Sequence, residues 1–185
     1  MKYTYNYPRP AVTTDAIVFG YNPKTCELNV LLIKRANEPF KGKWALPGGF
    51  LDMDETVEQC VHRELEEETG LKNVILEEMQ TFSEVDRDPR GRTISIVYFG
   101  LVSTLDHSPK AGDDASEAKW FSILRNPPMS FDHHKIIATA VNKFYNKIKY
   151  HTIDYMFIPK GFSLVHLKEI ETILSDYKIK NYTTL

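Results

Sequence analysis

The stretch that decides the fold is "GGFLDMDETVEQCVHRELEEETGL", which runs from Gly48 to Leu71. It predicts a helix over about Thr56–Thr69. Thr56 and Gln59 have the spacing of a capping box, in which each side chain bonds the other residue's backbone N–H. Gly70 is a natural C-terminal stop, because glycine readily adopts the left-handed conformation that ends many helices.

The last two turns of this helix concentrate negative charge. At about 100° per residue, Glu64, Glu67 and Glu68 overlap the apolar face, whereas Glu66 points toward water. The apolar face consists of Val57, Cys60, Val61 and Leu65. A solvated acidic face balanced by Arg63 and nearby lysines would explain the amount of charge but not its position. A bound magnesium or manganese ion would explain both, because hard cations prefer carboxylate oxygens.

Composition limits the class of protein. The chain has 185 residues, 42% of them hydrophobic, and a formal net charge of −2. It is long enough to bury one sizeable core with a small second module, and it lacks the basic surplus of a chain that binds nucleic acid over its whole surface. Cys26 and Cys60 form neither a disulfide framework nor a metal-ligand spacing, which favours a reducing, cytoplasmic compartment. No apolar run approaches the roughly 18 residues of a membrane span, so we expect a soluble protein without a membrane partner.

Strands and helices alternate over about residues 10–149, which predicts a layered α/β domain. The predicted elements are a strand at Asp15–Tyr21, a turn at Asn22 and Pro23, a strand at Leu28–Arg35, a strand at Arg92–Val102 and a helix at about Ile136–Lys149.

The composition changes at residue 150. The segment "HTIDYMFI" suggests a short strand, Pro159–Lys160–Gly161 a turn, and Ser163 the N-cap of an amphipathic helix. Residues 150–185 are therefore predicted to form a short strand-helix appendage.

The opening stretch also resembles the Nudix box at each of its fixed positions. These are Gly49, Glu55, Arg63–Glu64–Leu65, Glu67–Glu68 and Gly70–Leu71. The resemblance extends over about residues 10–149 and implies the Nudix α/β/α sandwich with a mixed sheet. The branch that the chain looks most like contains ADP-ribose pyrophosphatases and regulators whose Nudix domain senses ADP-ribose or other ligands.

The resemblance implies roles for the residues that match the box. Glu64, Glu67 and Glu68 would be ligands of Mg²⁺, with Mn²⁺ as a possible replacement, and Arg63 would orient them as part of the catalytic set. Glu55 would be a structural or metal-facing acid, and Glu117 an additional metal ligand, although Glu117 could equally be a surface acid on a loop. The residue that accepts the proton from the attacking water stays open among Glu68, Asp113, Asp114 and Glu117.

Substrate contacts are predicted at glycines and arginines. Gly48 and Gly49 would let the backbone approach the diphosphate. Arg35, and Arg87, Arg90 and Arg92 in "DRDPRGR", would bind phosphate or a terminal ribose, the alternative for this segment being a solvated hairpin loop. Phe19, Phe40 and Trp44 could stack on adenine, but core packing is the favoured role for each. His133 and His134 are not expected to share a metal, because adjacent helical side chains point in different directions.

These observations predict a Mg²⁺-dependent hydrolase that cleaves the diphosphate of ADP-ribose or a related nucleoside diphosphate derivative. The alternative is a ligand-sensing transcriptional regulator, because the tail resembles the beginning of the winged helix that follows the Nudix domain in such proteins. That module is incomplete here, so DNA binding would need a longer natural chain with its recognition helix. The resemblance implies a homodimer in either case.

Overall fold

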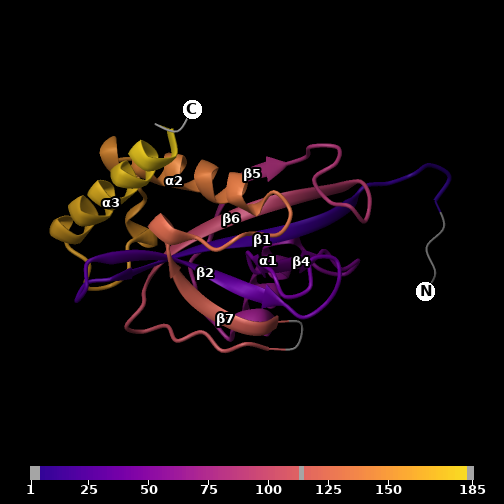
Figure 1. The fold of residues 1–185 in the computed structure, drawn as a ribbon, viewed down its shortest axis with the longest axis horizontal. Helices are drawn as coiled ribbons and strands as arrows, with labels where there is room; N and C mark the ends of the chain where they lie inside the picture. The colour runs from indigo at the N-terminus through magenta and orange to yellow at the C-terminus, as the bar shows by residue number, and fades with distance from the viewer. Residues whose placement is uncertain (1–4, 113–114, 183–185) are drawn as a thin grey trace.

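The computed structural model describes residues 5–112 and 115–182, in which seven strands form one mixed sheet (Figure 1). The central strand β1 (Ala11–Asn22) pairs in parallel with β6 (Thr93–Ser103) and antiparallel with β2 (Glu27–Arg35). The sheet order is β3-β2-β1-β6-β5, with β4 paired to β1 and β7 paired to β2. The remaining strands are β3 (Trp44–Ala45), β4 (Gly48–Phe50), β5 (Glu77–Phe82) and β7 (Ala115–Ser122).

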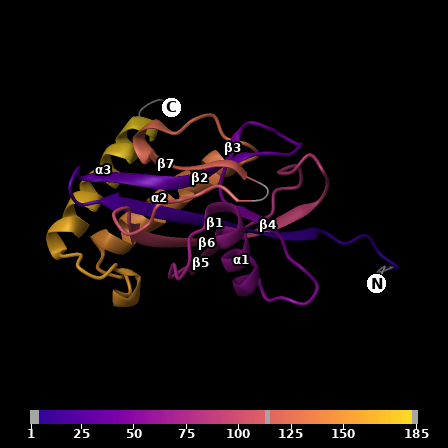
Figure 2. The ribbon, with the colours of Figure 1, turned by 90° about the horizontal axis from the view of Figure 1, so that it is seen from below.

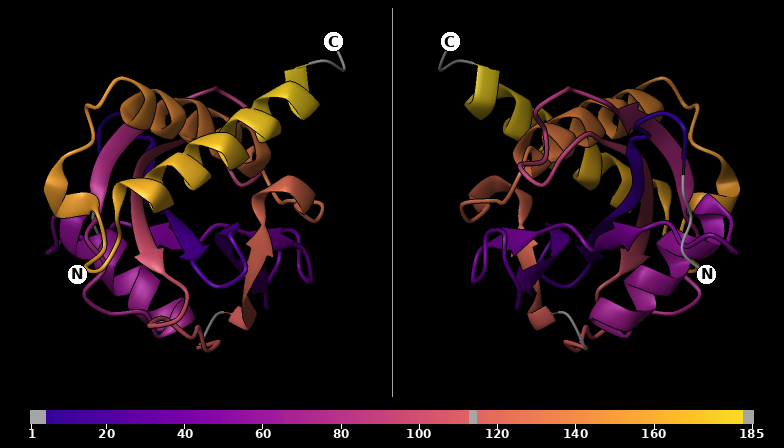
Figure 3. Two further views of the ribbon diagram at one scale, coloured as in Figure 1. Left: turned by 90° about the vertical axis from the view of Figure 1, so that its left-hand side faces the viewer. Right: turned by 90° about the vertical axis from the view of Figure 1, so that its right-hand side faces the viewer.

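Helices cover both faces of the sheet. Helix α1 (Val57–Thr69) lies on one face, and α2 (His133–Lys149) and α3 (Leu164–Tyr182) lie on the other (Figures 2 and 3). A short 3₁₀ helix, η1 (Ile123–Arg125), follows β7. The predicted α/β/α sandwich with a mixed sheet is thus confirmed.

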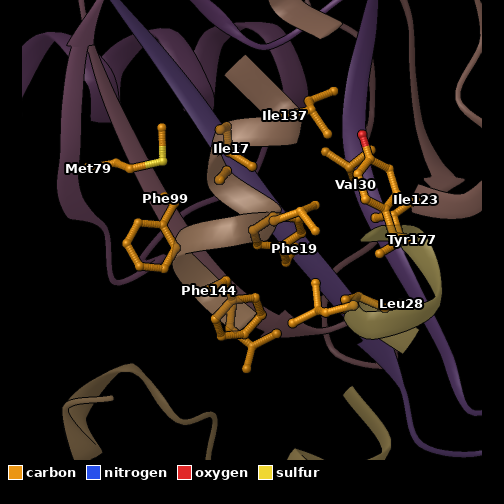
Figure 4. Close-up of a cluster of buried hydrophobic side chains, with 14 of the residues drawn as sticks. Ile17, Phe19, Leu28, Val30, Met79, Phe99, Ile123, Ile137, Phe144 and Tyr177 are labelled. Carbon is orange, nitrogen blue, oxygen red and sulfur yellow. The ribbon is translucent and has the colours of Figure 1, made fainter. Parts of the chain in front are cut away.

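The side chains of β1 point alternately to the two faces of the sheet, and the hydrophobic core is accordingly divided into two clusters. Ile17 and Phe19 pack under α2 and α3, whereas Ala16 and Val18 pack with Val61 and other residues of the α1 side. Because successive strand residues point to opposite faces, one apolar strand supplies both halves of the core. Figure 4 shows the larger cluster, in which Phe19 and Phe144 stack with their ring centroids 5.2 Å apart.

The main predicted elements are present, with small shifts at their ends. Helix α1 has Thr56 as its N-cap in a complete capping box with Gln59, and Gly70 ends it at φ 70°. Strand β1 is longer than predicted at both ends, and α2 begins at His133, three residues before its predicted start.

The strand predicted within residues 151–158 is wrong. Tyr155–Phe157 forms a 3₁₀ helix, η2, because Asp154 closes a local turn. Its side-chain Oδ1 accepts the Met156 N–H at 3.0 Å, and its carbonyl accepts the Phe157 N–H at 3.0 Å. The amphipathic helix expected after Ser163 is present as α3.

Cys60 is buried and Cys26 exposed, and both are free thiols. Over the residues described, no helix combines the length and the apolar character that crossing a membrane requires.

Candidate active site

The turn from β4 into α1 places the acidic residues against the sheet. The Gly48 N–H donates to Glu68 Oε2 at 2.8 Å. At Gly49 an added Cβ would lie 2.1 Å from Glu64 Oε1, so only glycine leaves room for this carboxylate. The two glycines therefore let the backbone approach Glu64 and Glu68 directly.

Arg63 joins the acids of this region. Its Nη1 donates to Glu64 Oε1 at 2.8 Å and to Glu67 Oε2 at 3.0 Å. Its Nε and Nη2 bind both oxygens of Glu55 at 3.0 and 2.7 Å, a bidentate geometry suited to the planar guanidinium. This contact, with the Asp52 N–H, holds the pKa of Glu55 at about 2. Arg63 is thus placed to orient the acids, and Glu55 serves as its anchor.

Glu64 and Glu68 are poorly stabilised as anions in the absence of a cation. Burial raises the pKa of Glu68 to about 8, and the negative charges of Glu64 and Asp15 add to this effect. Burial also raises the pKa of Glu64, although Arg63 partly offsets it. A positive ion close to both carboxylates would remove this penalty.

A cavity of about 420 Å³ lies beside these two acids. Its wall includes Glu64 and Glu68 on the α1 side and the guanidinium groups of Arg35, Arg87 and Arg90. Acidic oxygens and basic groups therefore share one chamber, which suits a cation and a phosphate bound together.

A buried ionic network forms part of the cavity wall. Arg87 binds Asp132 through two hydrogen bonds of 3.1 and 2.8 Å, and its Nη2 lies 3.8 Å from Asp15 Oδ2. Asp15 also accepts a hydrogen bond from the Ser95 hydroxyl. His133 Nδ1 accepts the Leu46 N–H at 2.9 Å, which leaves the proton on Nε2, 3.6 Å from Asp15 Oδ1. Burial lowers the pKa of His133, so its ring is neutral in this network.

Most residues predicted from the sequence to bind substrate come together here. Arg35, Gly48, Gly49 and Arg87 all line the cavity. Arg35 also donates to the Pro39 carbonyl at 2.7 Å. The side chain of Arg87 is 5% exposed and already paired with Asp132.

Three predicted site residues, Glu67, Glu117 and Arg92, are not among the residues that line this cavity. Glu117 lies on β7, where it pairs with Lys34 at 2.8 Å and with Lys119, and these lysines hold its pKa at about 2. Arg92 donates to the carbonyls of Ser83 and Glu84, at 2.9 and 3.2 Å. Asp113 and Asp114, the other candidate bases, lie outside the described residues.

The three aromatic residues considered for base stacking have other contacts. Phe19 lies in the core, and Trp44 packs edge-on against Phe121 with centroids 4.5 Å apart. Phe40 supports Phe131 at 4.8 Å. Of the two adjacent histidines, His133 is buried in the cavity wall and His134 is exposed, as expected from their different directions on α2.

The sequence reasoning missed several residues of the wall. Asp15, Phe50, Phe131 and His133 line the cavity together with the predicted residues. Asp15 carried a signal, because an acid at the start of a buried apolar strand needs a partner or a function. No sequence pattern indicated a site role for Phe131 or His133, because only the tertiary fold brings the start of α2 to β1 and β4.

The donor set fits a hard divalent cation. Among the described residues, no three Asp, Glu, His or Cys side chains already converge in the geometry of a closed metal site. Glu64 and Glu68 nevertheless face one cavity, and Arg63 ties the 52% exposed Glu67 to Glu64. These groups offer only oxygen ligands, which Mg²⁺ and Mn²⁺ prefer.

Comparisons with known proteins agree with this arrangement. The family model of the NUDIX domain matches residues 10–140. An ADP-ribose pyrophosphatase of Methanocaldococcus jannaschii is 47% identical over 131 residues, which cover 71% of this chain and 73% of that protein. The ADPR responsive transcriptional repressor NtrR of Acinetobacter baylyi is 31% identical over 179 residues, or 95% of this chain and 70% of the repressor.

A solved structure shows the same fold. The NUDIX domain of Shewanella oneidensis NrtR, crystallised with ADP ribose, superposes with a TM-score of 0.68 at 34% identity and covers 74% of this chain and 90% of its own. Fold, box geometry and relatives point the same way, and the chain belongs to the Nudix family.

Proposed function

We propose that this Nudix protein is a hydrolase that cleaves the diphosphate of ADP-ribose or a related nucleoside diphosphate derivative, with Mg²⁺ or Mn²⁺ as cofactor. The observation that carries the proposal is the shared cavity, whose lining combines Glu64 and Glu68 with four arginines, Arg35, Arg63, Arg87 and Arg90. This arrangement matches a cation bound to a diphosphate. The pyrophosphatase of M. jannaschii, at 47% identity, supports ADP-ribose as the substrate to test first.

Each site residue has a proposed task. Glu64, Glu67 and Glu68 hold the metal, and Arg63 positions Glu64 and Glu67 through its hydrogen bonds. When bound, Mg²⁺ neutralises charge on the diphosphate and acidifies water. Gly48 and Gly49 provide close backbone approach, and Arg35 with Arg87 supplies positive charge at the cavity wall.

The residue that accepts the proton from the attacking water stays open between Glu68 and an acid of the β6–β7 connection. Glu68 lies in the cavity wall and has a fixed orientation through Gly48. The reaction itself is balanced by one water, which adds to a phosphorus atom as the bridging P–O bond breaks, to give AMP and ribose 5-phosphate.

The test is incubation of the purified protein with ADP-ribose and MgCl₂, followed by chromatography of the products. AMP and ribose 5-phosphate in equal amounts, and no reaction with EDTA, are the expected result. If neither ADP-ribose nor any member of a panel of dinucleotides and nucleotide sugars is cleaved, the protein is not a hydrolase of this class.

A ligand-responsive repressor is the second candidate. The match to the A. baylyi repressor supports it, because that match spans 179 residues and includes the segment of α3. The natural full-length protein would then shift duplex DNA from its own promoter region, ADP-ribose would release it, and binding would weaken steeply with salt. Absence of any shift at low salt would reject this candidate.

We further propose a cytoplasmic homodimer. Residues 5–10 extend beyond the sheet at the start of β1 (Figure 1), and Tyr7 is 81% exposed. An extended arm with aromatic side chains is suited to pack against a second copy. Sedimentation of a monomer at micromolar concentration would contradict the dimer.

A further inference from the structure

Phe50, Phe131 and Arg90 form one stack in the cavity wall. The Arg90 guanidinium carbon lies 4.7 Å from the Phe50 ring centroid and 5.5 Å from the Phe131 ring centroid. The Phe131 ring also contacts a second cation, because the Arg35 guanidinium carbon lies 5.2 Å from its centroid. All three residues of the stack line the cavity that holds Glu64 and Glu68. Phe50 directly follows Gly49, whose Cα faces the Glu64 carboxylate, so the stack begins next to the acidic wall.

Phe50 is the most exposed phenylalanine of the described residues. It is 42% exposed, although it sits at the end of β4 beside a polar cavity. Leaving an aromatic face in water gives up the free energy of its burial. The Arg90 guanidinium covers one face of its ring, so the partner of Phe50 on the cavity side is a partly exposed group that a ligand can replace.

The backbone of Phe131 is strained. It adopts φ 51°, a left-handed conformation that is rare for bulky residues. Phe40, also at positive φ (66°), packs edge-on against it with centroids 4.8 Å apart. Such strained residues persist where the surroundings fix them, often at ligand sites. The strained pair presents the Phe131 ring to the cavity in one orientation.

Arg90 is the movable member of the stack. Its guanidinium is anchored to Asp88 by bonds of 3.0 and 2.7 Å, yet its side chain is 38% exposed and can leave the rings without crossing the core. A guanidinium group is planar and cationic, and it occupies the kind of space that a planar aromatic base would fill.

We propose that Phe50 and Phe131 form the nucleobase site, and that the base takes the place of Arg90 against the two rings. The flat π-surface of a purine stacks on both rings, and the displaced guanidinium turns toward the phosphates. This inference rests on the proposed function for its substrate class and adds which residues select a nucleotide over a simple sugar diphosphate.

The experiment compares two ligands that share a phosphate and differ in the base. Calorimetry of the magnesium-loaded protein gives dissociation constants for AMP and for ribose 5-phosphate. The ratio of the ribose 5-phosphate constant to the AMP constant measures how much the base contributes to binding. Wild type is expected to bind AMP at least about 10-fold more tightly, the order for one or two stacked aromatic contacts. Phe50→Ala and Phe131→Leu should each reduce that ratio about 10-fold, and Phe50→Trp should retain it.

Two further variants test the displacement itself. Arg90→Ala should keep the ratio or raise it, because the guanidinium no longer competes with the base for the rings. If the base instead stacked on Arg90 itself, Arg90→Ala would lower the ratio as much as Phe50→Ala. Met53→Ala removes a neighbouring apolar side chain that is 65% exposed and should change nothing. A wild-type ratio near 1, a ratio insensitive to Phe50, or a loss with Arg90→Ala equal to that with Phe50→Ala would overturn the proposal.

Kinetics separate this inference from the proposed function. In ADP-ribose hydrolysis, Phe50→Ala should raise KM about 10-fold with kcat within about threefold, since the base lies away from the bond that breaks. If ADP-ribose is not cleaved but AMP binding depends on Phe50, the hydrolase proposal fails and the base site stands. If hydrolysis occurs with an unchanged KM in Phe50→Ala, the base site fails and the hydrolase stands.

Discussion

Glu68 makes the stability of the metal-free protein depend on pH. Its folded pKa of about 8 lies above the ordinary value of 4.5, so the folded state binds the proton more tightly than the unfolded state. The favourable contribution is complete below about pH 4.5 and is lost as pH rises through 8. In EDTA, the melting temperature should therefore fall between pH 6 and pH 9 by several degrees.

Glu68→Gln is the matched test of this dependence. The substitution keeps an acceptor for the Gly48 N–H and removes the charge. The melting temperature should therefore depend much less on pH, and the dependence that remains should come from Glu64. Added MgCl₂ should stabilise wild type most at pH 8 to 9, where the carboxylates are ionised. Equal slopes for wild type and Glu68→Gln would show that Glu68 is not the titrating group.

The same substitution, with Glu67→Gln, tests the metal role. If these acids merely formed a charged surface, neutralising either would leave turnover unchanged and slightly relieve repulsion. If these acids are metal ligands, each substitution should lower turnover at least about 100-fold and weaken magnesium binding. The melting temperature without metal should stay unchanged or rise. Glu66→Gln, on the exposed side of α1, is the control and should retain wild-type turnover.

For single residues, the sequence predicts proximity where positions follow from local spacing. Glu64, Glu68 and Arg63 meet because they share one helix, and Gly48 and Gly49 meet them because the connecting turn is short. Glu117 and Arg92 depend on strand register and on a loop. Lys34 pairs with Glu117 across β2 and β7, a contact that no local pattern reveals.

At the scale of elements, the C-terminus of α1 is held by the segment before β7. Lys110 N–H donates to the Thr69 carbonyl at 2.8 Å, and Gly112 N–H to the Glu68 carbonyl at 3.4 Å. A Cβ at Gly112 would lie 1.8 Å from the Glu67 carbonyl oxygen. The segment thus fits against the turn of α1 that carries two of the proposed metal ligands, and only glycine permits this contact.

Gly112→Ala should therefore push this segment away from α1. We expect a loss of about 1 to 3 kcal/mol in the free energy of unfolding, the usual cost of overpacking, and a fall in kcat that exceeds any rise in KM. Ala111→Ser, at the exposed neighbouring position, should change stability by less than about 0.5 kcal/mol. Wild-type melting and turnover in Gly112→Ala would mean that the segment does not support the acids.

Elements with strong periodicity or clear caps could be predicted, and short ones could not. The capping box and Gly70 fixed α1 almost to the residue, whereas β3 and β4, of two and three residues, have too little sequence to show a pattern. The error in residues 151–158 has a physical cause, because the β-like composition of that segment is overruled by the Asp154 turn.

For the whole molecule, the tail is the least predictable part. From sequence it reads as an appendage, yet Leu167, Ile170, Leu174 and Tyr177 of α3 belong to the same buried cluster as Phe19 and Phe144. Figure 4 shows Tyr177 in this cluster. The Tyr21 hydroxyl of β1 also donates to Glu169 of α3. The Tyr21–Glu169 bond joins residues 148 positions apart, a pairing that local patterns do not encode.

If α3 is a structural part of the sandwich, its buried side chains should contribute to global stability. Ile170 and Leu174 are both 0% exposed, so Ile170→Ala or Leu174→Ala should cost about 2 to 5 kcal/mol by removing buried methyl groups and leaving a cavity. Urea unfolding followed by tryptophan fluorescence should show one cooperative transition at a lower midpoint. Trp44 and Trp120, which report on this transition, lie on β3 and β7.

The control is Val165→Ala on the same helix, where the side chain is 63% exposed. It should shift the midpoint by less than about 0.5 kcal/mol. An independently folding tail would behave differently, because its unfolding would leave the tryptophan signal of the sheet unchanged. An unaltered fluorescence midpoint in both buried variants would therefore assign α3 to a separate module, and the long-range packing of α3 would then contribute nothing to the stability of the site.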